Sequence, residues 1–315
     1  MKQWMTRNSF ALITAAALFL FTSYALLDTF VIPHAYQTAE GTATRKAAQK
    51  NTGNQAKDGT EQDNPDSDTP SEPVITENSY KDSAISVTIT EYRVNDTDIY
   101  VADVQLAAPE YLKTAFAKNT YGKNVKETTS AIAKEVDAIL AINGDFYGSR
   151  TGGYVIRNGV LYRDKASSNE ALAIYADGSM EVVKESQVSA KQLLSDGAVQ
   201  VLSFGPGLIE DGGICVSTRQ EVGRAMASNP RTAIGWYSDT HYVFVVADGR
   251  TGENDGLSLY ELAQFLQTLG VKTAYNLDGG GSSTMVFLGE VVNHPTTNGR
   301  SESERSVSDI VYIGY

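Results

Sequence analysis

The feature of this sequence best suited to chemistry is a carboxylate followed by a glycine turn and a row of hydroxyls. An apolar run at 274–277 ends at Asp278, and three glycines, two serines and a threonine follow at 279–284. Glycine allows positive φ and close approach of a ligand, and successive amides in such a turn can cradle an anion. The pattern predicts either an anion site beside an acid or a tight strand connection capped by Asp278.

Other apolar segments end in similar residues. The segment 138–142 leads into Asn143-Gly144-Asp145, and the segment 242–247 leads into Asp248-Gly249-Arg250. Such strand ends can converge in space, so we expect them to surround the Asp278 turn. For Arg250 alone, an ordinary surface ion pair is the simpler interpretation.

Arg231 has a more informative setting than Arg250. Pro230 fixes the backbone just before it, and an apolar segment follows. A guanidinium group can hold phosphate or carboxylate through two parallel hydrogen bonds. We therefore expect Asp278 and Arg231 to line one shared cavity.

The N-terminus carries a membrane signal. No charged residue occurs from Ser9 to Leu27, and Lys2 and Arg7 precede this run, which favours a single-pass signal anchor (1–35) with its N-terminus in the cytoplasm. The competing interpretation is a secretory signal peptide with a small-residue cleavage site at 23–25. Both interpretations place the rest of the chain outside the cytoplasm.

The remaining chain divides into a polar linker and one globular domain. Residues 36–82 are rich in Thr, Gln, Asn, Ser and acidic residues, which predicts a disordered acidic linker. Residues 83–315 are long enough for one domain with a substantial core. The net charge of -12 argues against nucleic acid or anionic lipid as the main partner, and the single Cys215 excludes an internal disulfide.

Hydrophobic patterning predicts an α+β domain with a mixed, largely antiparallel sheet or sheets and packed helices. Apolar residues alternate at 85–89, and 99–106 is expected to pair with this strand as its antiparallel neighbour. We expect helices at 109–116, 128–135 and 190–194, and a fourth that opens with a capping box at 258–261 and stops at Gly270.

Taken in order, these motifs resemble the phosphodiester glycosidase family over about residues 130–315. Asp145 departs from the family pattern, in which many relatives have a second glycine. The motifs that carry the resemblance are Asn143-Gly144-Asp145-Phe146-Tyr147, Asn229-Pro230-Arg231-Thr232-Ala233-Ile234-Gly235, Asp248-Gly249-Arg250, Asn276-Leu277-Asp278 with the glycines and hydroxyls at 279–284, and Glu304-Arg305-Ser306-Val307.

The resemblance implies an extracytoplasmic hydrolase that cleaves a glycosyl-1-phosphodiester in a cell-surface or exogenous glycan. It assigns Asp278 as nucleophile or general base, Glu304 as the second carboxylate and Asp248 as a residue that orients the sugar or supports the site. The expected substrate-binding residues are Arg231, Asn143, Asp145, Gly279, Gly280, Gly281, Ser282, Ser283 and Arg305.

Two other classes of function fit the same residues. The domain could bind a polysaccharide without catalysis, or it could transfer a glycosyl unit during exopolysaccharide or cell-wall assembly. The sequence requires no cofactor. Its acidic residues are compatible with a divalent cation, but no loop has a recognised cation-binding pattern.

Overall fold

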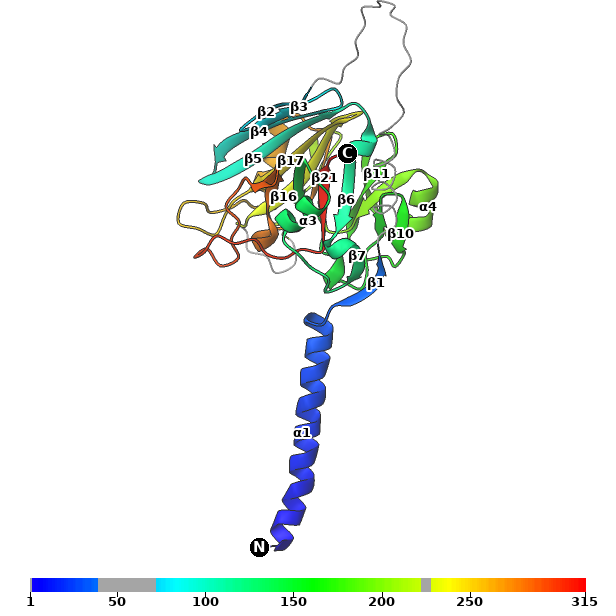
Figure 1. The fold of residues 1–315 in the computed structure, drawn as a ribbon, viewed down its shortest axis with the longest axis vertical. Helices are drawn as coiled ribbons and strands as arrows, with labels where there is room; N and C mark the ends of the chain where they lie inside the picture. Colours follow the sequence, from blue (N-terminus) through cyan, green and yellow to red (C-terminus); the bar gives the residue numbers. More distant parts are fainter. Residues whose placement is uncertain (1, 39–71, 222–227) are drawn as a thin grey trace, which may run out of the picture.

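Antiparallel sheets form the framework of the domain, which the computed structural model describes over residues 2–38, 72–221 and 228–315 (Figure 1). The largest sheet has nine strands in the order β15-β14-β18-β16-β17-β5-β4-β3-β2. Its strands are β2 (Val74–Thr76), β3 (Ser79–Lys81), β4 (Ile85–Val94), β5 (Thr97–Leu106), β14 (Gly207–Glu210), β15 (Gly213–Ile214), β16 (Arg231–Ser238), β17 (His241–Ala247) and β18 (Thr273–Asn276).

Two five-stranded sheets pack beside it, and one small sheet completes the fold. The first has the order β10-β9-β13-β11-β12: β9 (Val155–Arg157), β10 (Val160–Arg163), β11 (Glu170–Tyr175), β12 (Met180–Lys184) and β13 (Ala198–Leu202). The second has the order β20-β19-β8-β21-β6: β6 (Leu112–Phe116), β8 (Leu140–Asn143), β19 (Met285–Phe287), β20 (Glu290–Val291) and β21 (Asp309–Ile313). The small sheet pairs β1 (His34–Thr38) with β7 (Thr120–Lys123).

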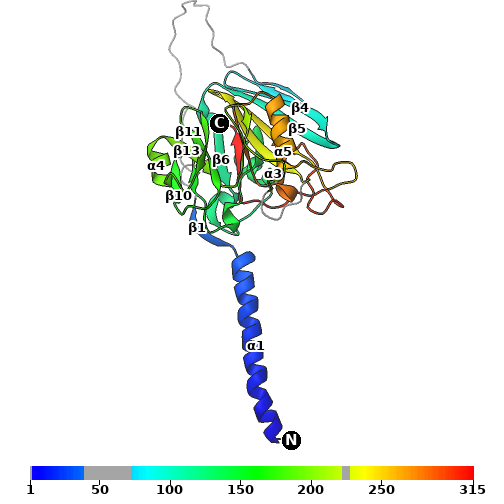
Figure 2. The same ribbon diagram turned by 180° about the vertical axis from the view of Figure 1, so that it is seen from behind.

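One core lies where the three larger sheets meet, and helices cover their outer faces. In β17, Tyr242, Phe244 and Val246 enter this central core, whereas the alternate residues face a second cluster. That cluster is covered by α5 (Leu259–Thr268), and α3 (Thr129–Glu135) and α4 (Ala190–Ser195) cover the two smaller sheets. Figure 2 shows α3, α4 and α5 at the periphery of the sheets. The predicted fold class and the capping box at Ser258 are confirmed.

The helix predicted at 109–116 is wrong. Pro109–Tyr111 forms only a turn of 3-10 helix, η1, and Leu112–Phe116 is strand β6. Burial alternates along β6, with Leu112, Thr114 and Phe116 inside, and the strand pairs with β21. This period of two belongs to a strand, and pairing with a distant segment outweighed the local helix-start signal of Pro109.

The predicted linker bounds are also wrong at both ends. The strand β1 occupies His34–Thr38, while β2 and β3 add residues 74–81 to the largest sheet. At both ends, strands that pair with other strands of the domain stand where a disordered linker was predicted. The central part of the predicted linker, 39–71, lies outside the described residues.

A long helix, α1 (Lys2–Phe30), projects from the domain with the N-terminus at its far end (Figure 1). Its segment Ala11–Phe30 has the length and apolar composition needed to cross a membrane, and none of it is buried against the domain. A signal sequence near an N-terminus would pass the same test.

A buried ion cluster joins the two five-stranded sheets. Arg157, the last residue of β9, donates to Asp145 at 2.9 Å and to Asp309 of β21 at 2.7 and 2.9 Å. All three side chains are within 2 % of full burial. Asp145 also accepts from the Ser203 amide at 2.8 Å, so the end of β13 is held to the same cluster.

The cluster has two carboxylates for one guanidinium group. Burial raises the pKa of Asp309 to about 8, with the nearby charge of Asp145 adding to the effect and Arg157 opposing it. The Asp309 Oδ1 atom has no hydrogen-bond partner among the described residues. A proton on Asp309 would leave the buried cluster electrically neutral, which a low-dielectric interior favours.

This cluster predicts a specific pH dependence of stability. The pKa of Asp309 is raised in the folded state, so its favourable contribution is complete below the ordinary carboxyl pKa near 4 and is lost as pH rises toward about 8. We expect the free energy of unfolding of Asp309→Asn, relative to the parent, to increase across this window by up to about 1.4 kcal/mol per pH unit.

Urea unfolding of the two proteins at several pH values between 4 and 9 measures this difference. Asp164→Asn, which changes an exposed carboxylate in the loop after β10, provides the matched control. A constant difference between Asp309→Asn and the parent over the whole range would show that Asp309 does not carry the proton.

Candidate active site

The Asp278 turn lies where β18 leaves the nine-stranded sheet and meets the ends of β8 and β16. The Leu277 amide donates to the Thr232 carbonyl at 2.9 Å, and the Gly280 amide donates to the Pro230 carbonyl at 2.8 Å. The turn continues as η4 (Gly280–Ser282), so the acid is at the mouth of a strand, as its sequence position indicated.

Asn143 fixes this junction with its amide. Its Nδ2 donates to the Asp278 carbonyl at 2.6 Å, and its Oδ1 accepts from Thr232 Oγ1 at 2.8 Å and from the Thr284 amide at 3.2 Å. The side chain is fully buried. Asn143 therefore holds the backbone of the acid and does not reach solvent.

Asp278 is a buried carboxylate with cationic neighbours. Burial raises its pKa, while Arg305, the Ser282 hydroxyl, the Gly279 amide and Arg150 lower it. Arg305 donates to Asp278 Oδ2 at 3.3 Å and to the Gly279 carbonyl at 2.9 Å. The acid is thus held between desolvation, which favours its protonated form, and positive charge, which favours its ionised form.

The three glycines are required by close packing. Gly280 has φ +62°, and a Cβ there would lie 2.7 Å from Arg250 Nη2. A Cβ at Gly281 would lie 2.2 Å from Thr297 Oγ1, and one at Gly279 would lie 2.9 Å from the Pro230 carbonyl oxygen. The turn therefore packs closely against Pro230, Arg250 and Thr297, which leaves no room for side chains at 279–281.

Four amides of this turn have partners within the chain. Gly279 donates to Asp278 Oδ1, Gly280 to Pro230, Ser282 to Gly279 and Ser283 to Gly280. This arrangement differs from the predicted amide cradle for phosphate. Positive charge near the turn comes from side chains instead.

Arg250 packs against the glycine turn at Gly280, whereas Arg305 donates to the turn directly. Its guanidinium group donates to Asn229 Oδ1 at 2.9 and 3.2 Å and to the Thr297 carbonyl at 2.9 Å. Burial lowers its pKa, and the charges of Arg305 and Arg231 lower it further. Within the described ranges, Arg250 contacts an amide oxygen and a carbonyl oxygen and forms no ion pair with a carboxylate.

Arg231 begins β16 next to the turn, and a Cβ at Gly279 would lie 3.9 Å from its Cα. Its guanidinium group, however, is 3 % exposed, donates to the Leu257 carbonyl at 2.7 Å and pairs with Glu221 at 2.7 Å. Burial lowers the pKa of Arg231, with Glu221 opposing the shift. The backbones of Arg231 and Asp278 are adjacent, but the side chain of Arg231 pairs with Glu221, so a cavity shared by the two side chains stays a prediction.

Two cations that the sequence analysis missed also face this region. Lys126 lies with its Nζ 5.6 Å from the centre of the Phe146 ring, and its pKa is lowered by burial and by Arg305 while Asp278 raises it. Arg150 stacks 4.8 Å from the Phe204 ring and lowers the pKa of Asp278. Neither residue has a sequence motif that would have revealed it, because each lies on a loop that is distant from Asp278 in the sequence.

The two other predicted catalytic acids have structural partners. Glu304 accepts from the Ser130 amide at 3.0 Å and from the Ser130 hydroxyl, which places its carboxylate at the first turn of α3. Asp248 is 2 % exposed and accepts from Asn293 Nδ2 at 2.8 Å and from the His294 amide. Burial raises the pKa of Asp248, whereas Asn293 and His294 lower it.

The remaining predicted binding residues lie at different depths. Ser282 accepts from Arg305 Nε at 2.9 Å, so it belongs to the acid's immediate surroundings. Ser283 is fully buried. Asp145 is 1 % exposed and belongs to the Arg157 cluster. Binding roles for Asp145 and Ser283 stay predictions.

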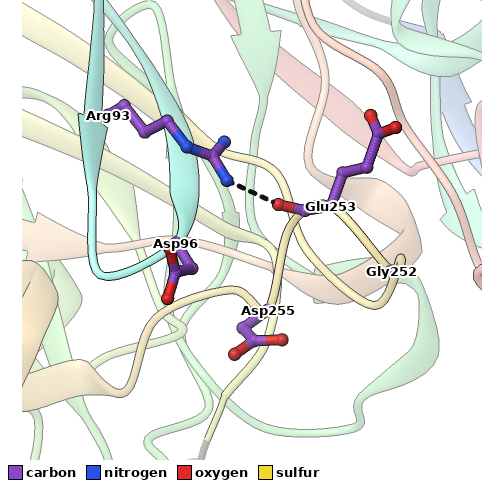
Figure 3. Close-up of a pocket in the computed structure, with 5 residues that line it drawn as sticks. All are labelled: Arg93, Asp96, Gly252, Glu253 and Asp255. Atoms are coloured by element: carbon purple, nitrogen blue, oxygen red, sulfur yellow. Dashed lines mark hydrogen bonds between the residues drawn. The ribbon is translucent and has the colours of Figure 1, made fainter.

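A separate surface hollow lies beside the loop that carries Arg250 (Figure 3). It has a volume of about 460 Å³ and is lined by Arg93, Asp96, Gly252, Glu253 and Asp255. Arg93 donates to the Glu253 carbonyl at 2.8 Å, which fixes the loop after Arg250. Its acidic lining disfavours an anionic ligand. Within the described ranges, no cluster of three His, Cys, Asp or Glu residues is arranged to hold a metal ion.

Comparisons with known proteins identify the family of this domain. Residues 137–314 match the family model for phosphodiester glycosidases. The chain belongs to the phosphodiester glycosidase family. The matched region contains Asn143, Arg250, Asp278 and Arg305, whereas Lys126 lies before it.

Similar proteins include a prophage protein and animal enzymes. The chain is 32 % identical over 203 residues to the uncharacterised SPbeta prophage-derived protein YomE of Bacillus subtilis, covering 62 % of this chain and 31 % of YomE. It is 31 % identical over 195 residues to mouse N-acetylglucosamine-1-phosphodiester alpha-N-acetylglucosaminidase, covering 55 % and 37 %. The chain therefore matches well under half the length of these relatives.

Solved structures support the fold. The zebrafish N-acetylglucosamine-1-phosphodiester alpha-N-acetylglucosaminidase catalytic domain superposes with a TM-score of 0.59 at 21 % identity, covering 73 % of this chain and 83 % of that one. A hypothetical protein from Synechocystis gives 0.55 at 16 % identity, covering 73 % and 62 %. At these identities the likeness establishes the fold alone.

The positively charged side chains near Asp278, which are Arg305, Arg250, Lys126 and Arg150, predict an anion-binding site to which Arg250 contributes. Arg250→Gln removes a charge next to Gly280 while keeping an amide side chain, so we expect the affinity for inorganic phosphate to fall at least about tenfold, since hydrogen bonds to charged groups contribute about 1.5–3 kcal/mol. Isothermal titration of the two proteins with phosphate measures the change. Arg300→Gln, an exposed arginine of the neighbouring loop, should leave the affinity unchanged. Equal losses in both variants would contradict a specific role for Arg250.

Proposed function

We propose that this protein is an extracytoplasmic hydrolase that cleaves a glycosyl-1-phosphodiester in a cell-surface or exogenous glycan. The observation that carries the proposal is a buried acid, Asp278, beside Arg305, with Arg250, Lys126 and Arg150 around it. These cations are gathered in a chain whose net charge is -12. Membership of the phosphodiester glycosidase family supports the same reaction.

The site supplies the two kinds of charge that this reaction needs. Cleavage between the anomeric carbon and the phosphate oxygen creates positive charge on the sugar ring and leaves negative charge on the phosphate. Asp278 would act on the sugar side as nucleophile or general base. Arg305 and Arg250 would stabilise the departing phosphate, because preorganised charges cost no reorganisation during the reaction.

We propose that the residues that support the site differ from those that would contact the substrate. Asn143 holds the Asp278 backbone, and Asp248 holds Asn293, whose Oδ1 accepts from the Met285 amide at 2.8 Å. Both are therefore proposed as positioning residues. Glu304 would take part as the second carboxylate only after leaving Ser130, whereas a phosphate leaving group has little need for a strong general acid.

We also propose that α1 anchors the protein in the membrane as a single pass, with the domain outside the cytoplasm. The apolar segment Ala11–Phe30 has a suitable length. The basic residues Lys2 and Arg7 precede it, which favours a cytoplasmic N-terminus.

Asp278→Asn tests the proposed reaction. The amide keeps the size of the side chain but is neither a nucleophile nor a base, so we expect the turnover of a cleavable glycosyl-1-phosphodiester to fall about a thousandfold or more. A panel of glycosyl-1-phosphodiesters is incubated with the purified protein, and free sugar and phosphomonoester are measured. Asp103→Asn should retain parental turnover.

Three results would count against the proposal. Phosphodiester binding that survives Asp278→Asn, without product from any compound in the panel, would favour a polysaccharide-binding protein. Product that appears only when an acceptor sugar is present would favour a glycosyl transferase. Retained hydrolysis by Asp278→Asn would remove Asp278 from the reaction.

A further inference from the structure

The end of α1 is joined to the domain almost directly. The helix ends at Phe30, and β1 begins at His34 and pairs with β7, with His34 opposite Lys123. Asn124 donates from Nδ2 to the carbonyls of Thr29 and Ile32, at 3.1 and 3.2 Å. Backbone pairing and a side-chain clamp therefore fix the end of the helix to one edge of the domain.

This contact is closely packed. A Cβ at Gly122 would lie 2.3 Å from the His34 carbonyl oxygen, so β1 lies directly on the backbone of β7. The Tyr36 ring lies 5.9 Å from the Tyr121 ring, which stacks at 5.4 Å on the buried Tyr147. The docking edge is thus continuous with the interior of the domain.

The candidate site starts at the same edge. Lys126 follows the clamp residue Asn124 by two positions, a span of at most about 7 Å. The Asn124 amide donates to the Gly148 carbonyl at 3.0 Å, and Gly148 is two residues before Arg150. The Asp278 amide donates to the Gly144 carbonyl at 3.3 Å, and Lys126 lies over the ring of Phe146, two residues after Gly144. The segment 144–150 therefore contacts both the clamp residue and the backbone of the acid. Figures 1 and 2 show the orange segment that contains η4 in the half of the domain nearer to α1.

The docking sets the height of the site above a membrane. Ala11–Phe30 spans about 30 Å as a helix, which matches the hydrocarbon thickness of a bilayer. Phe30 would then lie at the hydrocarbon boundary, with the exposed Tyr36 in the headgroup layer. Lys126 would lie on the order of 10 Å from that boundary, which is the depth of lipid headgroups.

We propose that the substrate is a glycosyl-1-phosphodiester whose second alcohol is a membrane lipid. This inference rests on the proposed hydrolase function and on the proposed anchoring by α1. A phosphate esterified to a lipid lies at the bilayer surface, where the cations around Asp278 are held. A flexible linker between α1 and the domain would not hold these cations at a fixed height above the membrane.

The proposed step is balanced hydrolysis. The oxygen of water forms a bond to the anomeric carbon, and the bond between that carbon and the phosphate oxygen breaks. The electron pair stays on the phosphate oxygen, and water's protons are shared between the released sugar hydroxyl and the solvent or phosphate. The products are a free sugar, which leaves the surface, and a lipid phosphomonoester, which stays in the bilayer.

A rigid spacer tests the proposed height. Three EAAAK repeats inserted between Ile32 and Pro33 would add about 20 Å of helix while leaving β1, β7 and the site unchanged. The full-length parent and the spacer variant are placed in vesicles that carry a lipid-linked glycosyl-1-phosphodiester. A soluble methyl diester of the same sugar phosphate is assayed with the same preparations. A flexible Gly/Ser insertion of equal length is the matched control, because it lets the domain return to the surface.

We expect the spacer to lower release of sugar from the lipid-linked substrate at least tenfold, with the flexible insertion retaining more activity and the soluble diester cleaved equally by all three proteins. Equal cleavage of the lipid-linked substrate by parent and spacer variant would overturn the inference. Cleavage of only the soluble diester would also overturn it and leave the proposed hydrolase intact. Failure of the parent on both substrates would overturn the proposed function together with this inference.

Discussion

The constraint on which the structure depends is the burial of Arg157 between two carboxylates. A guanidinium group without water is tolerated only when its charge is matched, and Asp145 and Asp309 provide that match from two directions. Because Asp309 begins β21 and Arg157 ends β9, the same bonds hold two sheets in register. Gly144 is packed against Asp309, and its carbonyl accepts from the Asp278 amide at 3.3 Å. The cluster therefore also supports the backbone of the candidate catalytic acid.

A second consequence is a division of labour among the acidic residues. Asp145 and Asp248 are buried, and their carboxylates accept hydrogen bonds from neighbouring chain segments. Asp278 differs because its nearest charged partner, Arg305, is partly exposed and because further cations approach from other loops. A carboxylate in such a position can change its charge during a reaction, whereas protonation of Asp145 or Asp248 would weaken the hydrogen bonds that hold these segments together. Aspartate therefore holds chain segments together at some positions of this domain and is the candidate catalytic acid at Asp278.

The relation between α1 and the domain bears on the biological setting. The sequence suggested a membrane segment and a tether, but β1 pairs with β7 immediately after the helix. Pairing between β1 and β7 fixes the orientation of the end of α1 relative to the domain, because backbone hydrogen bonds leave little freedom of rotation. The site then has a fixed distance from the helix end.

The sequence by itself determined the elements with strong local signals. Alternating apolar residues specified β4 and β5, the capping box at Ser258 specified α5, and ordered motifs indicated the family and the position of Asp278. Only the tertiary structure decided which side chains meet. The side chain of Arg231 pairs with Glu221, and the carboxylate of Glu304 accepts from Ser130. Arg250 packs against Gly280. The physical reason is that the direction of a long charged side chain depends on partners brought from distant loops and on the cost of burying its charge, neither of which its neighbours in sequence reveal.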